Sequence, residues 1–192
     1  MAKKNSLDEI CEASVRIFAK YGFRRTRVED IAIELGVATG TLYRYVKDKK
    51  DLYEKSVEYG ISKWQKKVIE AVSGVENVKE QFITMCTKSY QYLTQDADMH
   101  KILIDDPSIF PLSPRKVRFP DIDTASLNMI RNLLIKGIDS GVFRKVNIDQ
   151  TAELFYSIYV MFIIKTYIKS EGQSTQEMYE EGIDLLLNGL LS

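Results

Sequence analysis

The sequence has one histidine, His100, which excludes a metal site built from several histidines and leaves little for acid–base catalysis. It has two cysteines, Cys11 and Cys86, far apart in the chain, so neither a disulfide framework nor a C-x-x-C metal motif is present. No glycine-rich phosphate loop, H-E-x-x-H or G-x-S-x-G motif occurs. These absences argue against an enzyme, and they predict no metal and no cofactor.

Long apolar runs are also missing. The longest, residues 152–164, is interrupted by Glu153 and Ser157 and is too short to span a bilayer. The charged start, MAKKNSLDEI, has no apolar segment of the kind that a signal peptide needs. With its cysteines reduced, the chain is expected to be a soluble cytoplasmic protein without a membrane partner.

The chain has no net charge, since 27 basic residues balance 27 acidic ones, but the charges are unevenly distributed. Residues 1–50 carry 11 basic and 7 acidic side chains, whereas residues 51–192 carry 16 and 20. A basic amino-terminal segment before an acidic remainder is typical of a small nucleic-acid reader joined to another module. Ordinary variation along a solvated surface remains an alternative explanation for this difference.

Strand patterns are nearly absent, whereas helical periodicity recurs along the chain and predicts an all-α fold of about nine helices. The segments SLDE (residues 6–9) and TRVE (residues 26–29) each have the form of a helix capping box. All four prolines lie in residues 107–120, where they predict a loop. Three short helices in the first 45 residues precede a larger helical body.

The segment GVATGTLYRYVKDKKDL, residues 36–52, contains a helix that is weak by composition. Glycine costs roughly 1 kcal/mol against alanine inside a helix, and threonine loses rotamer freedom there. Its place after two short helices and a glycine turn favours a helix-turn-helix, in which a slim recognition helix enters the major groove. A small structural helical hairpin is the alternative.

In a recognition helix, Gly40 would let the backbone approach DNA closely, and Thr39 and Thr41 would offer hydroxyl and methyl groups. Tyr43 can reach a phosphate, although it can also pack between helices, and Arg44 can reach a phosphate or a guanine edge. Lys49 lies in the first turn of the fourth helix, where it could hold a phosphate together with backbone amides. Double-stranded DNA is therefore the predicted partner.

The stretch FAKYGFRRTRVEDIAIELGVATGTLYRYVKDKKDL, residues 18–52, resembles the signature of the TetR (tetracycline repressor) family of bacterial transcriptional regulators. The matching residues are Phe18, Gly22, Ile31, Ala32, Gly36, Val37, Gly40, Thr41, Leu42, Tyr43, Lys49 and Leu52. The resemblance implies a three-helix DNA-binding domain over residues 1–47 and a six-helix effector-binding and dimerisation domain over residues 48–192. It also implies a homodimer that binds a pseudo-palindromic operator, mostly as a repressor, and that a small molecule releases from DNA.

The chain departs from the family pattern at three positions. Ala38 replaces a frequent serine, which removes a helix N-cap typically worth about 1 kcal/mol. Arg27 replaces a frequent threonine and could exchange a hydroxyl–phosphate contact for a charged one, and Val46 replaces an aromatic residue. These changes leave the expected fold intact but make the operator sequence unpredictable from relatives.

The penultimate predicted helix is apolar nearly all round and the last one has a single apolar face, so a two-fold dimer made by them would bury both apolar surfaces. An ordinary monomer core is the alternative. The residues predicted for the dimer interface are Tyr159, Phe162, Tyr179, Ile183, Leu186, Leu187 and Leu190.

An effector pocket is expected in the larger domain, at positions where the resemblance places ligand. The candidate residues are Trp64, Met85, Tyr90, Phe110, Met129, Tyr156 and Tyr159. They predict a mostly apolar effector, lipid-like or aromatic, oriented by tyrosine hydroxyls. The segment 107–120 is either a mouth over this pocket or a plain surface connection. A DNA-binding scaffold that has no effector, or responds to a protein partner, remains the alternative function.

Overall fold

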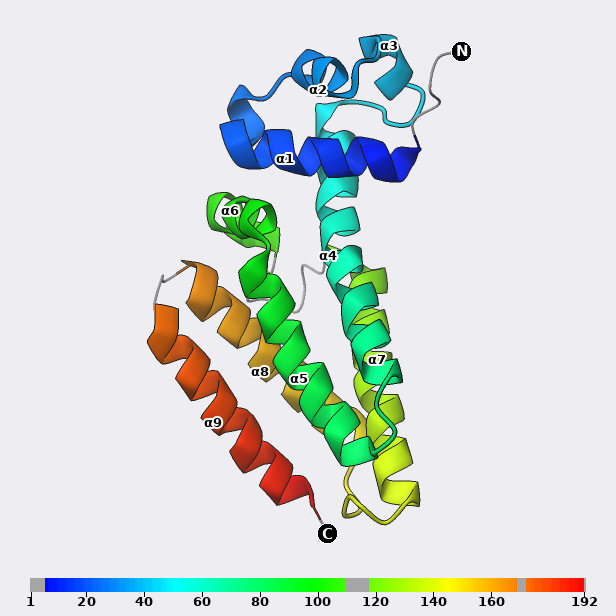
Figure 1. Ribbon diagram of the computed structural model, residues 1–192, viewed down its shortest axis with the longest axis vertical. Helices are drawn as coiled ribbons and strands as arrows, with labels where there is room; N and C mark the ends of the chain where they lie inside the picture. The colour runs from blue at the N-terminus through cyan, green and yellow to red at the C-terminus, as the bar shows by residue number, and fades with distance from the viewer. Residues whose placement is uncertain (1–5, 110–117, 169–171, 192) are drawn as a thin grey trace. The chain divides into compact units, whose positions relative to one another are not determined.

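The computed structural model describes residues 6–109, 118–168 and 172–191, and over these ranges it confirms the all-α prediction (Figure 1). The only extended pairing among these residues is an isolated bridge between Phe143 and Leu191. The helices are α1 (Leu7–Arg25), α2 (Val28–Leu35), α3 (Thr39–Leu42), α4 (Lys49–Ser73), α5 (Val78–Gln95), α6 (Ala97–Asp105), α7 (Pro120–Asp139), α8 (Ile148–Ile168) and α9 (Gly172–Leu190), with a 3₁₀ turn at Pro107–Ile109.

The chain divides into two compact units. The first consists of Met1–Lys63 and Asp96–Asp106, and the second of Trp64–Gln95 and Pro107–Ser192. Helix α4 contributes to both units, and α6 belongs to the first, where it packs on α1. The domain boundary predicted between residues 47 and 48 stays a prediction, because a division by contacts does not show which part folds independently.

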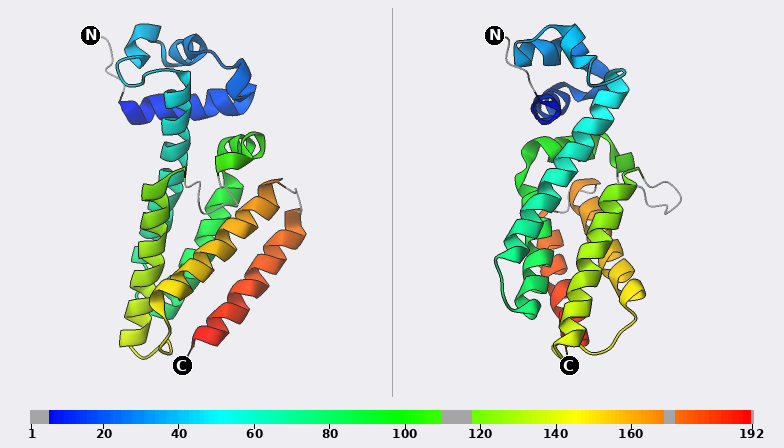
Figure 2. Two further views of the ribbon diagram at one scale, coloured as in Figure 1. Left: turned by 180° about the vertical axis from the view of Figure 1, so that it is seen from behind. Right: turned by 90° about the vertical axis from the view of Figure 1, so that its right-hand side faces the viewer.

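The first unit is built around α1, which packs against α2 and α6 (Figures 1 and 2). Phe18 of α1 is buried and meets the ring of Tyr53 of α4 edge-on, with centroids 5.0 Å apart. The Tyr53 hydroxyl donates to Asp106 at 3.1 Å, just beyond α6. One aromatic side chain thereby ties together three segments that are distant in sequence.

The second unit packs the end of α4 with α5, α7, α8 and α9 (Figure 1), mainly around one large apolar cluster, with a smaller one at Tyr90, Phe162 and Tyr179. Phe82 of α5 is fully buried at the centre of the large cluster. Its ring meets Phe143 and Phe155 edge-on, at centroid distances of 5.8 and 4.8 Å. This geometry suits the positive edge and negative face of aromatic rings.

The first predicted capping box is confirmed, and the second is wrong. Ser6 and Glu9 exchange both bonds that define a capping box at the start of α1. Thr26, however, is buried and donates its hydroxyl back to the Gly22 carbonyl at 2.9 Å. Helix α2 starts instead after Arg27, whose amide is bound by the Asp30 carboxylate at 2.9 Å. The Gly22 carbonyl accepts both the amide and the hydroxyl of Thr26. Because the hydroxyl is engaged at the end of α1, it does not cap α2, and the cap lies one residue later.

None of the helices in the described part of the chain has the length and apolar content that crossing a bilayer would require.

Candidate DNA-binding surface and ligand cavity

The recognition segment follows a tight turn. Gly36 ends α2 in the left-handed conformation, with φ 66° and ψ 33°, a conformation that glycine adopts without steric cost. The chain then forms α3, only four residues long, whose N-cap residue Ala38 makes no side-chain bond. So short a helix is not stable alone. Leu42, fully buried, anchors it to the rest of the first unit.

The residues predicted to read DNA flank Leu42 in sequence and are exposed or half-buried. Gly40 and Arg44 are exposed, Tyr43 is 48% exposed, and Thr39 and Thr41 are half-buried. A Cβ atom added to Gly40 would meet nothing within 4 Å. The packing of the protein therefore does not require glycine at this position, although glycine weakens the helix.

Two further predicted DNA contacts differ in their surroundings. Arg27 is exposed at the start of α2. Lys49 is half-buried, and its ammonium donates to the carbonyls of Phe23 (2.9 Å), Arg24 (3.4 Å) and Thr26 (3.1 Å). The ammonium also lies 4.7 Å from the centroid of the Phe23 ring. Lys49 therefore has a set of partners inside the protein that sequence reasoning did not foresee.

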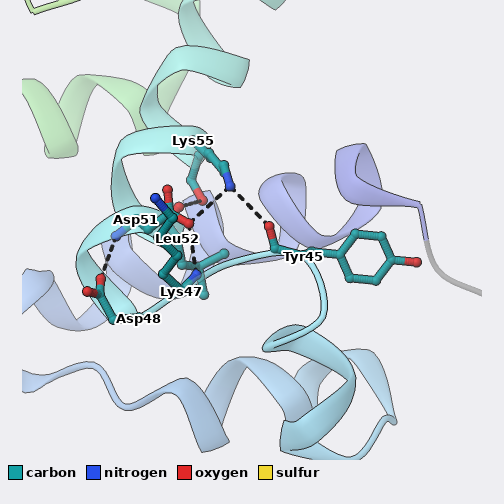
Figure 3. Close-up of polar contacts among 7 residues, drawn as sticks. Tyr45, Lys47, Asp48, Asp51, Leu52 and Lys55 are labelled. Atoms are coloured by element: carbon teal, nitrogen blue, oxygen red, sulfur yellow. Dashed lines mark hydrogen bonds and ion pairs between the residues drawn. The ribbon is translucent and has the colours of Figure 1, made fainter.

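The loop between α3 and α4 carries a second polar cluster (Figure 3). Asp48 caps α4 by accepting from the Asp51 amide at 2.8 Å. The Asp51 carboxylate accepts from the Lys47 amide at 2.9 Å and from the Lys55 ammonium at 3.0 Å. These bonds hold the pKa of Asp51 below its usual range, first through the Lys47 amide and then through Lys55.

Lys55 also donates to the main-chain carbonyl of Tyr45 at 3.0 Å, while the Tyr45 ring points away from the cluster (Figure 3). Sequence reasoning missed Lys55. The spacing of Asp51 and Lys55 by four residues does signal an ion pair on a helix. It gives no sign that a backbone carbonyl of the preceding loop is the second acceptor.

In the second unit, four of the seven predicted effector residues come together around a small cavity. We call it the tyrosine cavity, and its lining residues are Met85, Cys86, Ser89, Ser126, Met129, Ile130, Phe155, Tyr156, Tyr159, Tyr179 and Ile183. Its volume of about 40 Å³ holds a few water molecules at most. An effector would therefore have to displace side chains in order to enter.

Polar groups in this cavity are engaged inside the protein. The hydroxyl of Tyr156 donates to the Asp123 carboxylate, and that of Tyr179 donates to the Cys86 carbonyl at 2.9 Å. Burial raises the pKa of both tyrosines and of Tyr159, and it raises the pKa of the Cys86 thiol to about 12. At neutral pH the cavity therefore offers neutral hydroxyl and thiol groups. Sequence reasoning missed Asp123, because nothing in the pattern pairs it with a tyrosine 33 residues away.

The other predicted effector residues lie elsewhere. Tyr90 lines a second, larger cavity of about 420 Å³ between α5 and α9, whose lining includes Glu180 and Asp184. Trp64 is buried on α4 and lines neither of these two cavities. Phe110 lies outside the described residues, as does most of the predicted loop 107–120.

The residues predicted for the dimer interface lie largely inside the protomer, and their role in a dimer stays a prediction. Phe162, Tyr179, Leu187 and Leu190 are buried, and Ile183, Leu186 and Tyr159 are partly buried. Because α8 is apolar nearly all round, its pattern could not distinguish the inward face from the outward one. Among the side chains of α8 and α9 that the structure describes, the large apolar ones that are exposed are Leu154, Met161, Met178 and Leu185.

A short exposed helix after a glycine turn, anchored by one apolar residue and joined to a separate helical unit, defines a helix-turn-helix DNA-binding regulator. Residues 10–55 match the family model described as bacterial regulatory proteins, tetR family. The amino-terminal part of the chain is therefore that of a TetR-family regulator, and the curated relatives that the chain matches are regulators of transcription.

Two curated relatives are regulators of similar length. The chain is 26% identical over 145 residues to the fatty acid metabolism regulator protein of Bacillus subtilis (strain 168), covering 74% of this chain and 73% of the relative. It is 20% identical over 190 residues to the HTH-type transcriptional repressor KstR2 of Rhodococcus jostii (strain RHA1), covering 99% and 93%.

A solved structure with a similar fold is that of the transcriptional regulator FadR from Bacillus subtilis in complex with stearoyl-CoA. The TM-score is 0.74 at 19% identity, covering 94% of this chain and 97% of that one. At this identity the likeness concerns the fold.

Proposed function

We propose that the chain is a ligand-responsive repressor, which binds a pseudo-palindromic DNA operator as a homodimer and is released by a small, mostly apolar effector. The observation that carries the DNA-binding part is Gly40. Glycine weakens this four-residue helix, although the protein itself has room for a side chain at position 40. Close approach of an outside partner, such as the floor of the major groove, explains that choice.

The same surface supplies the chemistry for reading DNA. Arg44 is exposed beside Gly40 and would reach a guanine edge or a phosphate, and Tyr43 and Arg27 would contact phosphates. Thr39 and Thr41, both half-buried, would contribute hydroxyl and methyl groups at the helix start. Lys49 was expected to bind a phosphate, but its three carbonyl partners argue against that role.

The homodimer is supported by the apolar residues that α8 and α9 expose. Met161 lies seven residues after Leu154 on α8, and Leu185 lies seven residues after Met178 on α9, so each pair lies on one side of its helix. Leu185 is 65% exposed. A second copy of the same surface would cover these exposed apolar side chains. Two subunits would supply one recognition helix to each half-site of the operator.

The effector is proposed to occupy an opened form of the tyrosine cavity. Its lining is mostly apolar, and among its lining residues no lysine or arginine would pair with an anion inside. The chemistry fits an apolar chain or ring with one or two hydrogen-bonding groups. Stearoyl-CoA, which the similar regulator binds, carries such a chain. We extend the resemblance by proposing that effector entry moves α4, and that this movement changes the spacing of the two recognition helices.

The small volume of the cavity, about 40 Å³, favours the second candidate function, a DNA-binding regulator without a small-molecule effector or with a protein partner. The two candidates differ in whether a small molecule alone changes operator affinity. A ligand must favour one state by several kcal/mol, about 5.5 kcal/mol for a nearly complete switch, to control the equilibrium.

Selection from a random duplex library should enrich an inverted repeat, because a two-fold dimer reads the same half-site twice. Arg44→Ala and Tyr43→Ala are run in parallel. Loss of Arg44 should relax one position of the motif and cost about 1–3 kcal/mol, whereas loss of Tyr43 should weaken all sequences alike. A single unrepeated motif would contradict the dimer. The absence of any motif would contradict sequence reading.

Stearate and stearoyl-CoA should each raise the melting temperature and release the operator, whereas free coenzyme A should do neither. A ligand at about 100 times its Kd adds about 2.7 kcal/mol of stability, which corresponds to several degrees for a chain of this size. The measurements are thermal unfolding and fluorescence anisotropy of labelled operator. Free coenzyme A controls for binding through the nucleotide. If no lipid or aromatic compound changes the melting temperature or the operator anisotropy, the result favours a regulator without a small-molecule effector.

A further inference from the structure

Two lysines of α4 hold the main chain of the helix-turn-helix. We propose that Lys49 and Lys55 are positioning residues, which fix the recognition segment against α4 through backbone carbonyls and do not contact DNA. The proposal rests on the proposed DNA-binding function and adds how α4 controls it. We call the two lysines with their acceptors the α4 lysine clamp.

The Lys49 part of the clamp closes the end of α1. An ammonium has three N–H donors and no acceptor. The carbonyls of Phe23, Arg24 and Thr26 provide three acceptors, at 2.9, 3.4 and 3.1 Å. A cation there also compensates the partial negative charge at the carboxyl end of a helix. To contact a phosphate, Lys49 would have to break its hydrogen bonds to these carbonyls. We therefore infer that its ammonium binds the protein and not the DNA.

The Lys55 part holds the loop that follows α3. Lys55 donates to the Tyr45 carbonyl and to the Asp51 carboxylate, both at 3.0 Å. The same carboxylate oxygen accepts the Lys47 amide at 2.9 Å. Two residues of α4 therefore bind both a carbonyl and an amide of the loop, two residues apart (Figure 3). The loop cannot shift relative to α4 without breaking at least one of these bonds.

The recognition segment needs such support because little else orients it. Helix α3 has four residues and no side-chain cap, and only Leu42 and Val46 of its neighbourhood are buried. Leu42 limits how far the segment can move from the core, but a single side chain does not set the angle of a helix. The backbone bonds at residues 45 and 47 set that angle. Any movement of α4 is thereby passed to the residues that face the groove.

The salt dependence of DNA affinity distinguishes a lysine that contacts a phosphate from one that positions the recognition segment. A lysine that neutralises a phosphate releases counterions on binding, so removing it lowers the slope of log affinity against log salt by about 1. A lysine that positions the recognition segment changes the affinity for the operator without changing that slope. It also leaves binding to unrelated DNA nearly unchanged, because that binding depends on phosphates.

The test measures the affinity of Lys49→Met and Lys55→Met for the selected operator and for a scrambled duplex of equal length, over a range of KCl concentrations. Each variant should bind the operator about tenfold more weakly, with the affinity for scrambled DNA within about twofold and an unchanged salt slope. Arg27→Ala, which removes a proposed phosphate contact, should lower the slope by about 1. Lys66→Met, which removes the same charge from an exposed site on α4, should match the wild type in every respect.

Amide hydrogen exchange without DNA supplies an independent readout. The amides of Tyr45 and Val46 are bonded to the Leu42 carbonyl at 2.9 and 3.2 Å. They should exchange faster in Lys55→Met than in Lys66→Met. If Lys49→Met does not fold, Lys55→Met carries the test, because Lys55 and its partners Tyr45 and Asp51 are only half-buried.

The proposal would be overturned if the variants had a lower salt slope and lost equal affinity for the operator and for scrambled DNA. It would also be overturned if Lys55→Met left both the operator affinity and the amide exchange unchanged. Wild-type protein without any preference for one duplex would instead overturn the proposed function, while faster exchange at residues 45 and 46 would still support the structural role of the clamp.

Discussion

Replacing Gly137 with alanine is expected to lower the free energy of unfolding by about 1–3 kcal/mol, the usual cost of forcing extra atoms into a packed core. The sign is unusual, because alanine in place of glycine inside a helix normally adds roughly 1 kcal/mol of stability. The added Cβ would overlap the ring of Phe143. Phe143 is buried and meets Phe82 edge-on, so it has little freedom to move away.

The backbone around Gly137 adds to this constraint. Its carbonyl accepts the amides of Val142 and Phe143, each at 3.0 Å. Phe143 is therefore fixed through its own amide to the residue against which its ring packs. The main chain after α7 cannot carry the ring outward without losing these bonds. We expect the strain to fall on the aromatic contacts of Phe82, at the centre of the second unit.

Urea unfolding followed by circular dichroism would measure the change, with Gly182→Ala as the matched control. Gly182 also lies inside a helix, but a Cβ there would meet nothing within 4 Å. Gly182→Ala should leave stability unchanged or raise it by up to about 1 kcal/mol. Phe143→Leu should reduce the cost of Gly137→Ala, and the double-mutant cycle gives the coupling between the two sites. If Gly137→Ala alone, with Phe143 unchanged, were as stable as the wild type, the overlap between an alanine Cβ at position 137 and the Phe143 ring would be wrong.

Much of the fold follows from the sequence because helical periodicity and helix caps are local signals. The Ser6–Glu9 box and the Asp48 cap were both predictable, since each involves residues within one turn. The partner of each helix was less accessible. The packing of α6 on α1 joins segments about 80 residues apart. Its buried residues, such as Met99, look like those of any amphipathic helix.

Within the candidate site, prediction succeeded in placing side chains on a surface and was less successful in assigning their partners. The exposed face of α3 was predictable because Leu42 is the one residue of this helix that turns inward. The acceptors of Lys49 lie 23 to 26 residues away and are backbone carbonyls, which every residue has. No residue type in the sequence marks them. The inward face of α8 could not be distinguished from its outward face for a different reason, since this helix is apolar nearly all round.

The second large effect is expected from Leu42→Ala. The change removes the buried side chain that holds α3, and such truncations cost about 2–5 kcal/mol in a well-packed core. Leu42 is fully buried although it belongs to a helix of four residues. Without this anchor, ordering the segment on DNA would have to be driven by binding itself, at about 1–2 kcal/mol for each residue fixed. Operator affinity should therefore fall by a factor of 100 or more, which corresponds to about 3 kcal/mol.

Two variants separate the anchor from a general loss of apolar surface. Ile33→Ala removes an apolar side chain of the same size from neighbouring α2, but Ile33 is 78% exposed, so the stability of the protein should change by less than about 0.5 kcal/mol. Leu42→Met keeps the volume and should cost less than about 1.5 kcal/mol, retaining most of the operator affinity. Urea unfolding and anisotropy with the selected operator measure both quantities. If Leu42→Ala lost stability but still bound the operator as tightly as Leu42→Met, the backbone bonds of Lys55 and Asp51 would be sufficient to order the recognition segment, and Leu42 would serve stability alone.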